Sequence, residues 1–368
     1  MKEINLLVTL VDLHFGGISN LTLQTLPKLS EKMNVSVVYF GPNADMLERF
    51  EDAGIRVERI KYDGGKDVFK TAFRLRKYIK ENEINIVSTN FTPDKLVASI
   101  TRLFIKFLIV GTIHNSFNPH ITPIKKRTWR GRFEEFFHNK VCNKVIGVSN
   151  AAIENAIKYR NLENRNLSVV HSGIPPISKK VKKNTKNEKI IFVTACRLVE
   201  IKGLFRLLDR FKQLNETRNN WELWIIGDGK LKKDLIKKTF DLDIDKKVFF
   251  KGYQTKLDSF YLQADYYINS SYNEALGVSI IEAMSIGLPT IGSRVGGIPE
   301  VIKDNVNGFL LDFEDEQNGI EVLKRAMDLE PELYKLLVSN SLMVYENKFS
   351  ISSYVNNLQD TLLKMKLN

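Results

Sequence analysis

Two glutamates and a glycine in the stretch SSYNEALGVSIIEAMSIGLP, residues 270–289, have the types and spacing of a ligand-binding turn. Glu274 and Glu282 have seven residues between them, and Gly277 is one of these. Apolar residues recur at helical spacing over 278–286, so we expect a turn that leads into a helix near Gly277. The free N–H groups of a helix start bind anions, phosphate above all. One carboxylate could then bind a polar group beyond the phosphates, and the other could bind a hydroxyl on the opposite side of them. A nucleotide sugar has this layout of sugar, diphosphate and ribose.

The same glutamates also fit a plainer interpretation. In it, Glu274 stabilises the helix dipole and Glu282 is a solvated helix residue. Two cations at another strand end are also candidates for binding a ligand. Arg197 and Lys202 follow the strand that we expect at Ile190–Ala195, and a planar guanidinium beside an ammonium group makes a phosphate clamp. Ordinary surface charge is the alternative for these two side chains.

Candidate ligand-binding residues in the first half of the chain also follow strands. Gly16 and Gly17 come after a strand expected at 4–10, and glycines at such a turn let a ligand approach the backbone closely. The dinucleotide fingerprint G-x-G-x-x-G is absent there, and a tight turn explains the glycine pair equally well. His114 follows the strand expected at Leu108–Ile113. A lone histidine at such a place is more often structural than functional.

Runs typical of strands alternate with helical runs along the whole chain. This alternation predicts an α/β fold with doubly wound parallel sheets. A length of 368 residues suits about two domains. The stretch PPISKKVKKNTKNEK, residues 175–189, is rich in Lys, Pro and Asn and is predicted to be a linker. We therefore expect a first domain at 1–174 and a second at 190–349, with an amphipathic helix in the last residues, 350–368.

The composition points to a globular protein of the cytoplasm. Hydrophobic residues make up 43% of the chain and charged residues 27%, without a low-complexity tract. The two cysteines, Cys142 and Cys196, are far apart and lack metal-ligand spacing, which is typical of a reduced protein. No apolar run reaches the roughly 18 residues that a membrane-spanning helix needs.

The net charge of +12 includes a basic segment at residues 102–132, which contains no acidic residue. Its cations, which alternate with aromatic side chains, are Arg102, Lys106, Lys125, Lys126, Arg127, Arg130 and Arg132. An anionic membrane surface or a nucleic acid would suit this segment, and a solvated basic face is the plainer alternative. No helix-turn-helix, zinc or RNP pattern supports nucleic-acid binding. We therefore expect no nucleic acid as a partner and favour a peripheral contact with the inner face of the cell membrane.

The segment from Glu274 to Pro289 resembles the signature of the retaining, nucleotide-sugar-dependent glycosyltransferases of family 4, which have the GT-B architecture. Further segments of the second half resemble other elements of that family: 194–203, 225–229, 251–253, 295–300 and 307–310. Cys196 stands where the family usually has glycine. In the first half, the resemblance includes Val148-Ser149 and the segment 171–175, with Ser172 in place of the usual asparagine.

This resemblance implies two Rossmann-like domains facing across a cleft, with the acceptor on the first domain and the donor on the second. The C-terminal helix would cross back onto the first domain. The implied reaction is a hexosyl transfer of class EC 2.4 with retention of anomeric configuration. It would move a sugar from a UDP- or GDP-sugar to a saccharide or lipid-linked acceptor, in surface polysaccharide or glycolipid synthesis. No metal or other cofactor is implied, because Arg197, Lys202 and the helix start would stabilise the departing diphosphate.

The resemblance also assigns residues to the site. The implied catalytic residues are Glu274, Arg197, Lys202 and His114. The implied donor-binding residues are Gly16, Gly17, Tyr253, Ala275, Leu276, Gly277, Val278 and Glu282. Among them, Glu274 would hold hydroxyls of the transferred sugar, Glu282 would hold the ribose, and Tyr253 would pack near the base.

Three other interpretations stay open at this stage. A metal-dependent glycosyltransferase would need an Asp-x-Asp site, and the acidic run at 241–245 is a candidate, although a solvated turn is the simpler explanation. A nucleotide-sugar epimerase or hydrolase could share the fold. A basic nucleic-acid-binding protein is the alternative from a different class. The residues do not identify the sugar, the nucleotide, the acceptor or the oligomeric state.

Overall fold

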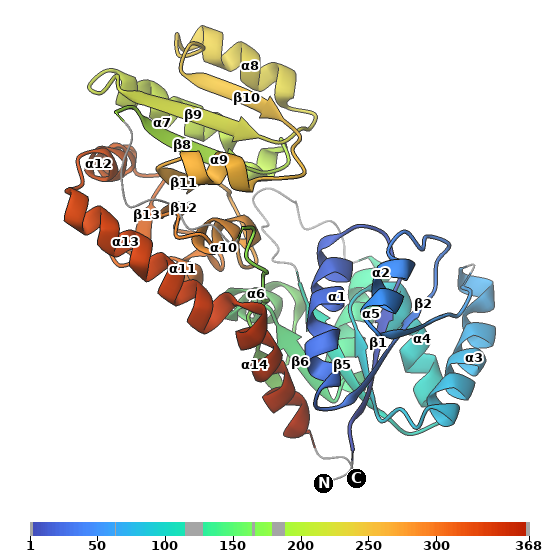
Figure 1. The fold of residues 1–368 in the computed structure, drawn as a ribbon. Helices are drawn as coiled ribbons and strands as arrows, with labels where there is room; N and C mark the ends of the chain where they lie inside the picture. Colours follow the sequence, from blue (N-terminus) through green and yellow to red (C-terminus); the bar gives the residue numbers. More distant parts are fainter. Residues whose placement is uncertain (1–2, 63, 115–127, 164–165, 179–187, 366–368) are drawn as a thin grey trace. The chain divides into compact units, whose positions relative to one another are not determined.

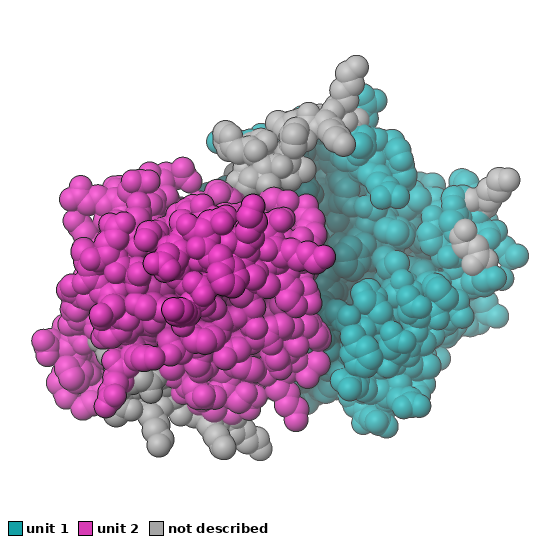
Figure 2. Space-filling model, turned by 90° about the horizontal axis from the view of Figure 1, so that it is seen from above, with its two compact units in different colours: residues 1–173, 351–368 teal, residues 174–350 magenta. Residues whose placement is uncertain are grey.

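The chain forms two compact units in the computed structural model (Figure 2). Unit 1 consists of residues 1–173 and 351–368, and unit 2 consists of residues 174–350. The structure describes residues 3–62, 64–114, 128–163, 166–178 and 188–365. Most of the linker predicted at 175–189 lies outside these residues, as do Lys125, Lys126 and Arg127 of the basic segment.

Unit 1 is built on a parallel sheet, which in the described part of the chain has seven strands in the order β3-β2-β1-β4-β5-β6-β7 (Figure 1). These strands are β1 Asn5–Leu10, β2 Asn34–Tyr39, β3 Arg56–Arg59, β4 Ile86–Thr89, β5 Leu108–Ile113, β6 Lys144–Gly147 and β7 Leu167–Val169. The central strand β1 pairs with β2 on one side and β4 on the other. Because the strands are parallel, the segments after β1, β4 and β5 meet at one edge of the sheet.

Helices cover both faces of this sheet. They are α1 Gly17–Ser30, α2 Leu47–Asp52, α3 Val68–Glu81, α4 Thr92–Arg102, α5 Trp129–Phe136, α6 Asn150–Arg160 and α14 Ile351–Leu363. One apolar core joins the sheet to α1, α2 and α14, and a second joins it to α3 and α4. The last helix, α14, lies beside α1, where Lys28 Nζ is 2.9 Å from Ser352 Oγ. Its residues Ile351, Val355 and Leu362 are buried in the first of these cores.

Unit 2 repeats the design with a parallel sheet that has six strands among the described residues, in the order β10-β9-β8-β11-β12-β13. These strands are β8 Ile190–Ala195, β9 Trp221–Ile226, β10 Val248–Gly252, β11 Tyr266–Asn269, β12 Thr290–Ser293 and β13 Gly308–Leu311. The helices are α7 Leu204–Asn215, α8 Lys232–Asp241, α9 Asp258–Gln263, α10 Val278–Met284, α11 Ile298–Val301, α12 Glu316–Met327 and α13 Pro331–Val344. Their apolar faces enclose a core with Phe192, Phe211 and Trp221. The two Rossmann-like sheets confirm the predicted fold class.

Several boundaries differ from the sequence-based expectation by one to three residues, because helix and strand ends fray. Helix α5 is followed by a π-helical turn at Phe137–Val141, and the helix expected at 350–368 is α14, which ends at Leu363. The acidic run at 241–245 forms the turn between α8 and β10, where Asp243 has a positive φ of 55°. No helix in the described ranges is both long and apolar enough to cross a membrane.

Candidate active site

The candidate site in unit 2 forms where two neighbouring strands end. Strands β8 and β11 pair directly, so the segment after each lies beside the other. Ser270 Oγ donates to Lys202 O at 2.8 Å, and Tyr272 N donates to Ile201 O at 2.8 Å. Gly203 has a φ of +64°, and a Cβ there would lie 2.1 Å from Ser270 O. Only glycine allows this approach, so the sequence Lys202-Gly203 is required for the two segments to meet.

Lys202 and Glu274 meet at this junction, as neighbours in space although 72 residues separate them in the chain. Lys202 Nζ lies 2.5 Å from Glu274 Oε1, and the side chains are only 20% and 15% exposed. Ser271 Oγ donates to the same carboxylate oxygen at 2.8 Å. The attraction within a partly buried ion pair is screened less than within an exposed pair, which helps to hold both groups in one geometry.

Arg206 holds the segment that leads to Glu274. Its Nε donates to Ser270 O at 2.9 Å and its Nη2 to Ser271 O at 2.6 Å. The guanidinium also lies 3.8 Å from the ring centroid of Tyr272, a cation–π contact. The sequence analysis did not identify Arg206. The only signal was its position four residues after Lys202, in the first turn of α7.

The turn before α10 is fixed from the other side by two glycines. Gly297 N donates to Glu274 O at 3.0 Å. A Cβ on Gly296 would lie 2.1 Å from Glu274 O, and one on Gly297 would lie 2.2 Å from Ala275 O. The glycines of the Val-Gly-Gly segment therefore let the 274–275 backbone pass close to them. Leu276 is buried in this turn, which gives it a packing role.

Helix α10 begins at the predicted place. Gly277 has a φ of +95°, a left-handed conformation that favours glycine, and the helix runs from Val278 to Met284. Val278 is 46% exposed, so the first turn of the helix is open to solvent. The N–H groups of a first helical turn have no partner within the helix and carry a partial positive charge.

Glu282 lies one turn further along α10 and is half-buried. Within the described residues its carboxylate has no hydrogen bond or ion pair. Burial raises the pKa of this carboxyl to about 7. A carboxylate that is partly desolvated and unpaired can gain much from hydroxyl donors of a ligand.

Two other expected residues of unit 2 lie apart from this pair. Arg197 is exposed on the segment after β8, and no carboxylate in the described chain pairs with it. Tyr253 follows β10, two strands away from β8, and is 75% exposed. The structure shows no contact of either side chain with Lys202 or Glu274. Both are free to move onto a ligand.

The expected residues of unit 1 lie at the carboxyl edge of its own sheet. Gly17 begins α1, and the space beside it is open, because a Cβ there would meet nothing within 4 Å. Gly16 has an extended φ of −164°, so neither glycine is required for backbone reasons. His114 follows β5, and its Nε2 lies 2.9 Å from Asn90 Oδ1. The sequence analysis did not identify Asn90.

The arrangement in unit 2 has the parts of an anion-binding site with hydroxyl acceptors beside it. Lys202 and the first turn of α10 supply positive charge, while Glu274 and Glu282 supply carboxylate oxygens. The thiol of Cys196 is no candidate nucleophile, because burial raises its pKa to about 11. Within the described ranges, no three His, Cys, Asp or Glu side chains are grouped as ligands for a metal ion.

Models of known protein families match both halves of the chain. The model of glycosyl transferases group 1 matches residues 175–341, and the model of Glycosyltransferase Family 4 matches residues 15–176. The chain belongs to the group 1 glycosyltransferases of family 4. This confirms the resemblance that the 274–289 segment indicated.

Two relatives of this glycosyltransferase match it along most of their own lengths. An uncharacterized glycosyltransferase of Haemophilus influenzae is 24% identical over 90% of this chain and 92% of its own length. The UDP-Gal:alpha-D-GlcNAc-diphosphoundecaprenol alpha-1,3-galactosyltransferase of Escherichia coli is 25% identical over 81% of this chain and 80% of its own length. Among solved structures, HepE of Anabaena in complex with UDP and glucose has a TM-score of 0.77 at 18% identity, covering 98% of this chain and all of that one. That similarity establishes the GT-B fold of this glycosyltransferase.

Proposed function

We propose that this glycosyltransferase moves a sugar from a UDP- or GDP-sugar to a saccharide or lipid-linked saccharide acceptor, with retention of anomeric configuration. One observation carries the proposal: along the chain, Glu274, which pairs with Lys202, precedes the first turn of α10, and the carboxylate of Glu282, unpaired among the described residues, follows it. This order of groups matches the sugar, diphosphate and ribose of a nucleotide sugar. Glu274 would orient the sugar hydroxyls, and Glu282 would accept hydrogen bonds from the ribose.

Breaking the bond between sugar and phosphate places negative charge on the diphosphate. Lys202, the exposed Arg197 and the first turn of α10 would stabilise that charge where it develops. Two cations and a helix start supply the counter-charge that a metal ion supplies elsewhere, so we propose that no metal is required. The departing phosphate would take the proton of the acceptor hydroxyl on the same face of the sugar. His114 would bind a sugar hydroxyl, and Tyr253 would pack near the base.

Two of the similar proteins favour UDP over GDP as the nucleotide. HepE was crystallised with UDP and glucose, and the galactosyltransferase of Escherichia coli is named for a UDP-sugar donor and a diphosphoundecaprenol acceptor. By analogy, we propose a UDP-sugar donor and a lipid-linked acceptor for this chain, in the synthesis of a surface polysaccharide or glycolipid.

A thermal-shift screen of nucleotide sugars, with and without EDTA, tests the donor site. We expect one donor class to raise the melting temperature, because a ligand that binds the native state stabilises it. The shift should persist in EDTA and disappear in Glu282→Ala. With the donor identified, NMR of the product gives its anomeric configuration, and Arg197→Ala, Lys202→Ala and Glu274→Ala should each abolish turnover. An inverted product, or near-normal rates for all three variants, would contradict the proposed mechanism.

An assay without acceptor separates this proposal from an enzyme that only hydrolyses or epimerises the donor. The proposed transferase consumes donor rapidly only when an acceptor is present. Equal consumption of donor with and without acceptor would favour a hydrolase or an epimerase of the same fold.

We also propose that unit 1 contacts an anionic membrane, on the inner face of the cell membrane where a lipid-linked acceptor would lie. Exposed apolar side chains gather where α3 meets the end of α4: Phe69, Phe73, Leu103 and Phe104. The rings of Phe73 and Phe104 pack at a tilt of 33°, with centroids 4.8 Å apart. Exposed cations surround them on the same elements: Lys70, Arg74, Lys77 and Lys106. Exposed aromatic rings among cations suit the interface of an anionic bilayer.

Sedimentation with vesicles tests this contact. The protein should sediment with vesicles containing phosphatidylglycerol at low salt and remain in solution with phosphatidylcholine vesicles. Phe73→Ser combined with Leu103→Ser should weaken sedimentation, whereas Phe240→Ser, which removes an exposed ring of α8 in unit 2, should not. If the wild-type protein fails to sediment with anionic vesicles at low salt, the membrane contact is wrong.

A further inference from the structure

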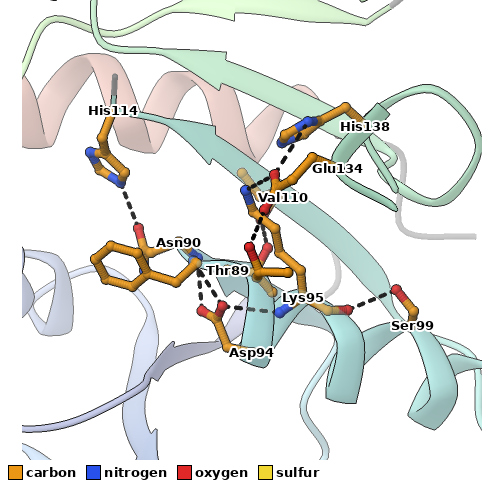
Figure 3. A network of polar contacts seen from close by, with 11 residues as sticks. Thr89, Asn90, Asp94, Lys95, Ser99, Val110, His114, Glu134 and His138 are labelled. Atoms are coloured by element: carbon orange, nitrogen blue, oxygen red, sulfur yellow. Dashed lines mark hydrogen bonds and ion pairs between the residues drawn. The ribbon is translucent and has the colours of Figure 1, made fainter. Parts of the chain in front are cut away.

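A chain of hydrogen bonds in unit 1 ends at the imidazole of His114 (Figure 3). His114 follows β5 and Asn90 follows β4, and these two strands are paired neighbours. The pairing brings Asn90 Oδ1 to 2.9 Å from His114 Nε2. The two side chains therefore meet because of the sheet register, although 24 residues separate them in sequence.

The orientation of the Asn90 amide decides which nitrogen of His114 carries the proton. Asn90 Nδ2 donates to Thr9 O at 3.3 Å, so the amide oxygen is the atom that faces the imidazole. An amide oxygen only accepts, and therefore Nε2 of His114 must carry the hydrogen and donate it. The lone pair then lies on Nδ1. No described residue forms a hydrogen bond with Nδ1.

Asn90 is itself held rigidly by Asp94. The backbone N–H of Asn90 donates to Asp94 Oδ2 at 2.8 Å, and that of Phe91 donates to Asp94 Oδ1 at 2.8 Å. Thr9 Oγ1 lies 3.2 Å from Asp94 Oδ2. Asp94 is fully buried, so these bonds are shielded from water. These bonds hold the backbone of Asn90, and the bond from Nδ2 to Thr9 O orients its amide.

The surroundings keep His114 neutral. Burial and the nearby charge of Lys95 lower the pKa of His114 to about 4. Lys95 is paired with Glu134 at 2.7 Å, and its side chain is 5% exposed, so this cation is fixed in place. Three other titratable groups lie in this part of unit 1. Burial raises the pKa of Asp94 to about 6 and lowers the pKa of His138 to about 3. Tyr354 of α14 lines the same cavity as His114.

We propose that Asn90 is a positioning residue: it holds His114 with its proton on Nε2, so that Nδ1 is presented as a hydrogen-bond acceptor to a hydroxyl of the sugar substrate. The role of the hydroxyl partner rests on the proposed function. A neutral imidazole with a free lone pair selects a hydroxyl, which can donate, over a phosphate oxygen, which cannot. An imidazolium would make the opposite choice, and here burial and the charge of Lys95 both oppose it.

Nitrogen NMR of the full-length protein labelled at histidine tests the positioning step without any substrate. The chain has five histidines, and loss of a signal in His114→Gln assigns the one in question. We expect His114 to be protonated on Nε2 between pH 6 and 8 in the wild type, and to become a mixture of tautomers in Asn90→Ala. A proton on Nδ1 in the wild type would overturn the proposal, and so would an unchanged tautomer in Asn90→Ala. This readout does not depend on which donor or acceptor the enzyme uses.

Kinetics test whether the position matters for turnover. Asn90→Ala should lower kcat/KM about ten-fold, and adding it to His114→Ala should cause little further loss, because the two residues act as a unit. Asn90→Asp keeps the shape but places an anion beside the imidazole, which raises the pKa of His114. On acidification from pH 8 to 6, activity of this variant should fall more than that of the wild type, in which protonation of Glu282 already contributes. Asn34→Asp adds the same charge at an exposed position of β2 and should behave as wild type. Wild-type turnover in Asn90→Ala, or an unchanged pH profile in Asn90→Asp, would sink the proposal.

Discussion

Replacing Glu282 by glutamine should make unit 2 more stable at pH 8 while it weakens binding of the donor. Burial raises the pKa of the Glu282 carboxyl from its ordinary value of 4.5 to about 7 in the folded protein. As the pH rises from 4.5 to 7, the unfolded chain loses this proton while the folded chain keeps it, so stability falls over that window. Above pH 7 the folded protein bears the full cost of a buried anion. Glutamine has the shape of the protonated acid and never bears this cost.

The size of the effect follows from the same two pKa values. At about 1.4 kcal/mol for each pH unit, the interval from 4.5 to about 7 corresponds to about 3 kcal/mol at pH 8. At pH 5 the difference between the variant and the wild type should shrink to about 1 kcal/mol, because the folded carboxyl is protonated and the pH is only slightly above the unfolded pKa of 4.5. For a unit of this size, about 3 kcal/mol corresponds to a shift in melting temperature of about 6–12 °C.

Tryptophan fluorescence can follow this unit selectively. Two of the three tryptophans, Trp221 and Trp224, are buried in unit 2, whereas Trp129 of unit 1 is 63% exposed. Unfolding is monitored for the wild type and Glu282→Gln at pH 5 and pH 8. Glu321→Gln, which changes an exposed carboxylate on α12, is the matched control and should show no pH-dependent difference. If Glu282→Gln is less stable than the wild type at pH 8, or if its advantage is equal at both pH values, the assignment of an unpaired buried carboxylate is refuted.

Three further predictions concern the same architecture. Lys202→Ala and Glu274→Ala should each lower kcat by at least about 100-fold, and the double variant should be scarcely worse than either, because each single change leaves a charged partner unpaired. The exposed pair Lys335 and Glu332 is the control, and its removal should leave kcat unchanged. Independent losses at Lys202 and Glu274 would argue against a functional pair. Gly296→Ala should abolish turnover while unit 1 stays folded, since the added Cβ would lie 2.1 Å from Glu274 O. Gly54→Ala is the control, because Gly54 also has a positive φ but has open space around it. Normal activity in Gly296→Ala would show that the 274–275 backbone is not held as described. Val355→Asp should destabilise unit 1 by about 3 kcal/mol or more, because it buries a charge, and it should not move the unfolding transition that the tryptophans of unit 2 report. Asn356→Asp, on the exposed side of α14, is the control and should not change stability. Equal resistance of the two variants to proteolysis would contradict the packing of α14.

The sequence predicted the helices and strands well, because the spacing of apolar residues and the residues that begin and end each element are local properties. The strands at Leu108–Ile113 and Ile190–Ala195 were predicted with the bounds that the structure shows, and α10 begins after Gly277 as expected. Gly277 was also readable, since a glycine between a strand and a helical run suggests a left-handed residue. Local patterns of this kind carry no information on which distant segments meet.

Residues that act through pairing of distant strands were missed for that reason. Arg206 is an ordinary exposed helix cation in the sequence, and only the β8–β11 pairing shows that it holds the segment before Glu274. Asn90 is likewise indistinguishable from a loop residue until β4 and β5 are paired. A weak signal was present beside it, because Thr92-Pro93-Asp94 has the proline and the acidic residue typical of a helix start, and Asp94 does bond the N–H of Phe91 there.

The position of α14 has a consequence for the order in which the protein can fold during synthesis. The core of unit 1 includes Ile351, Val355 and Leu362, which leave the ribosome after the whole of unit 2. Until then, apolar side chains of α1 such as Leu26 and Leu29 have no cover from this helix. Unit 2 is continuous in sequence and can complete its core first, although unit 1 is made earlier. The N-terminal unit should therefore be the later of the two to reach its native state, and the one that depends more on chaperones while the chain is still growing.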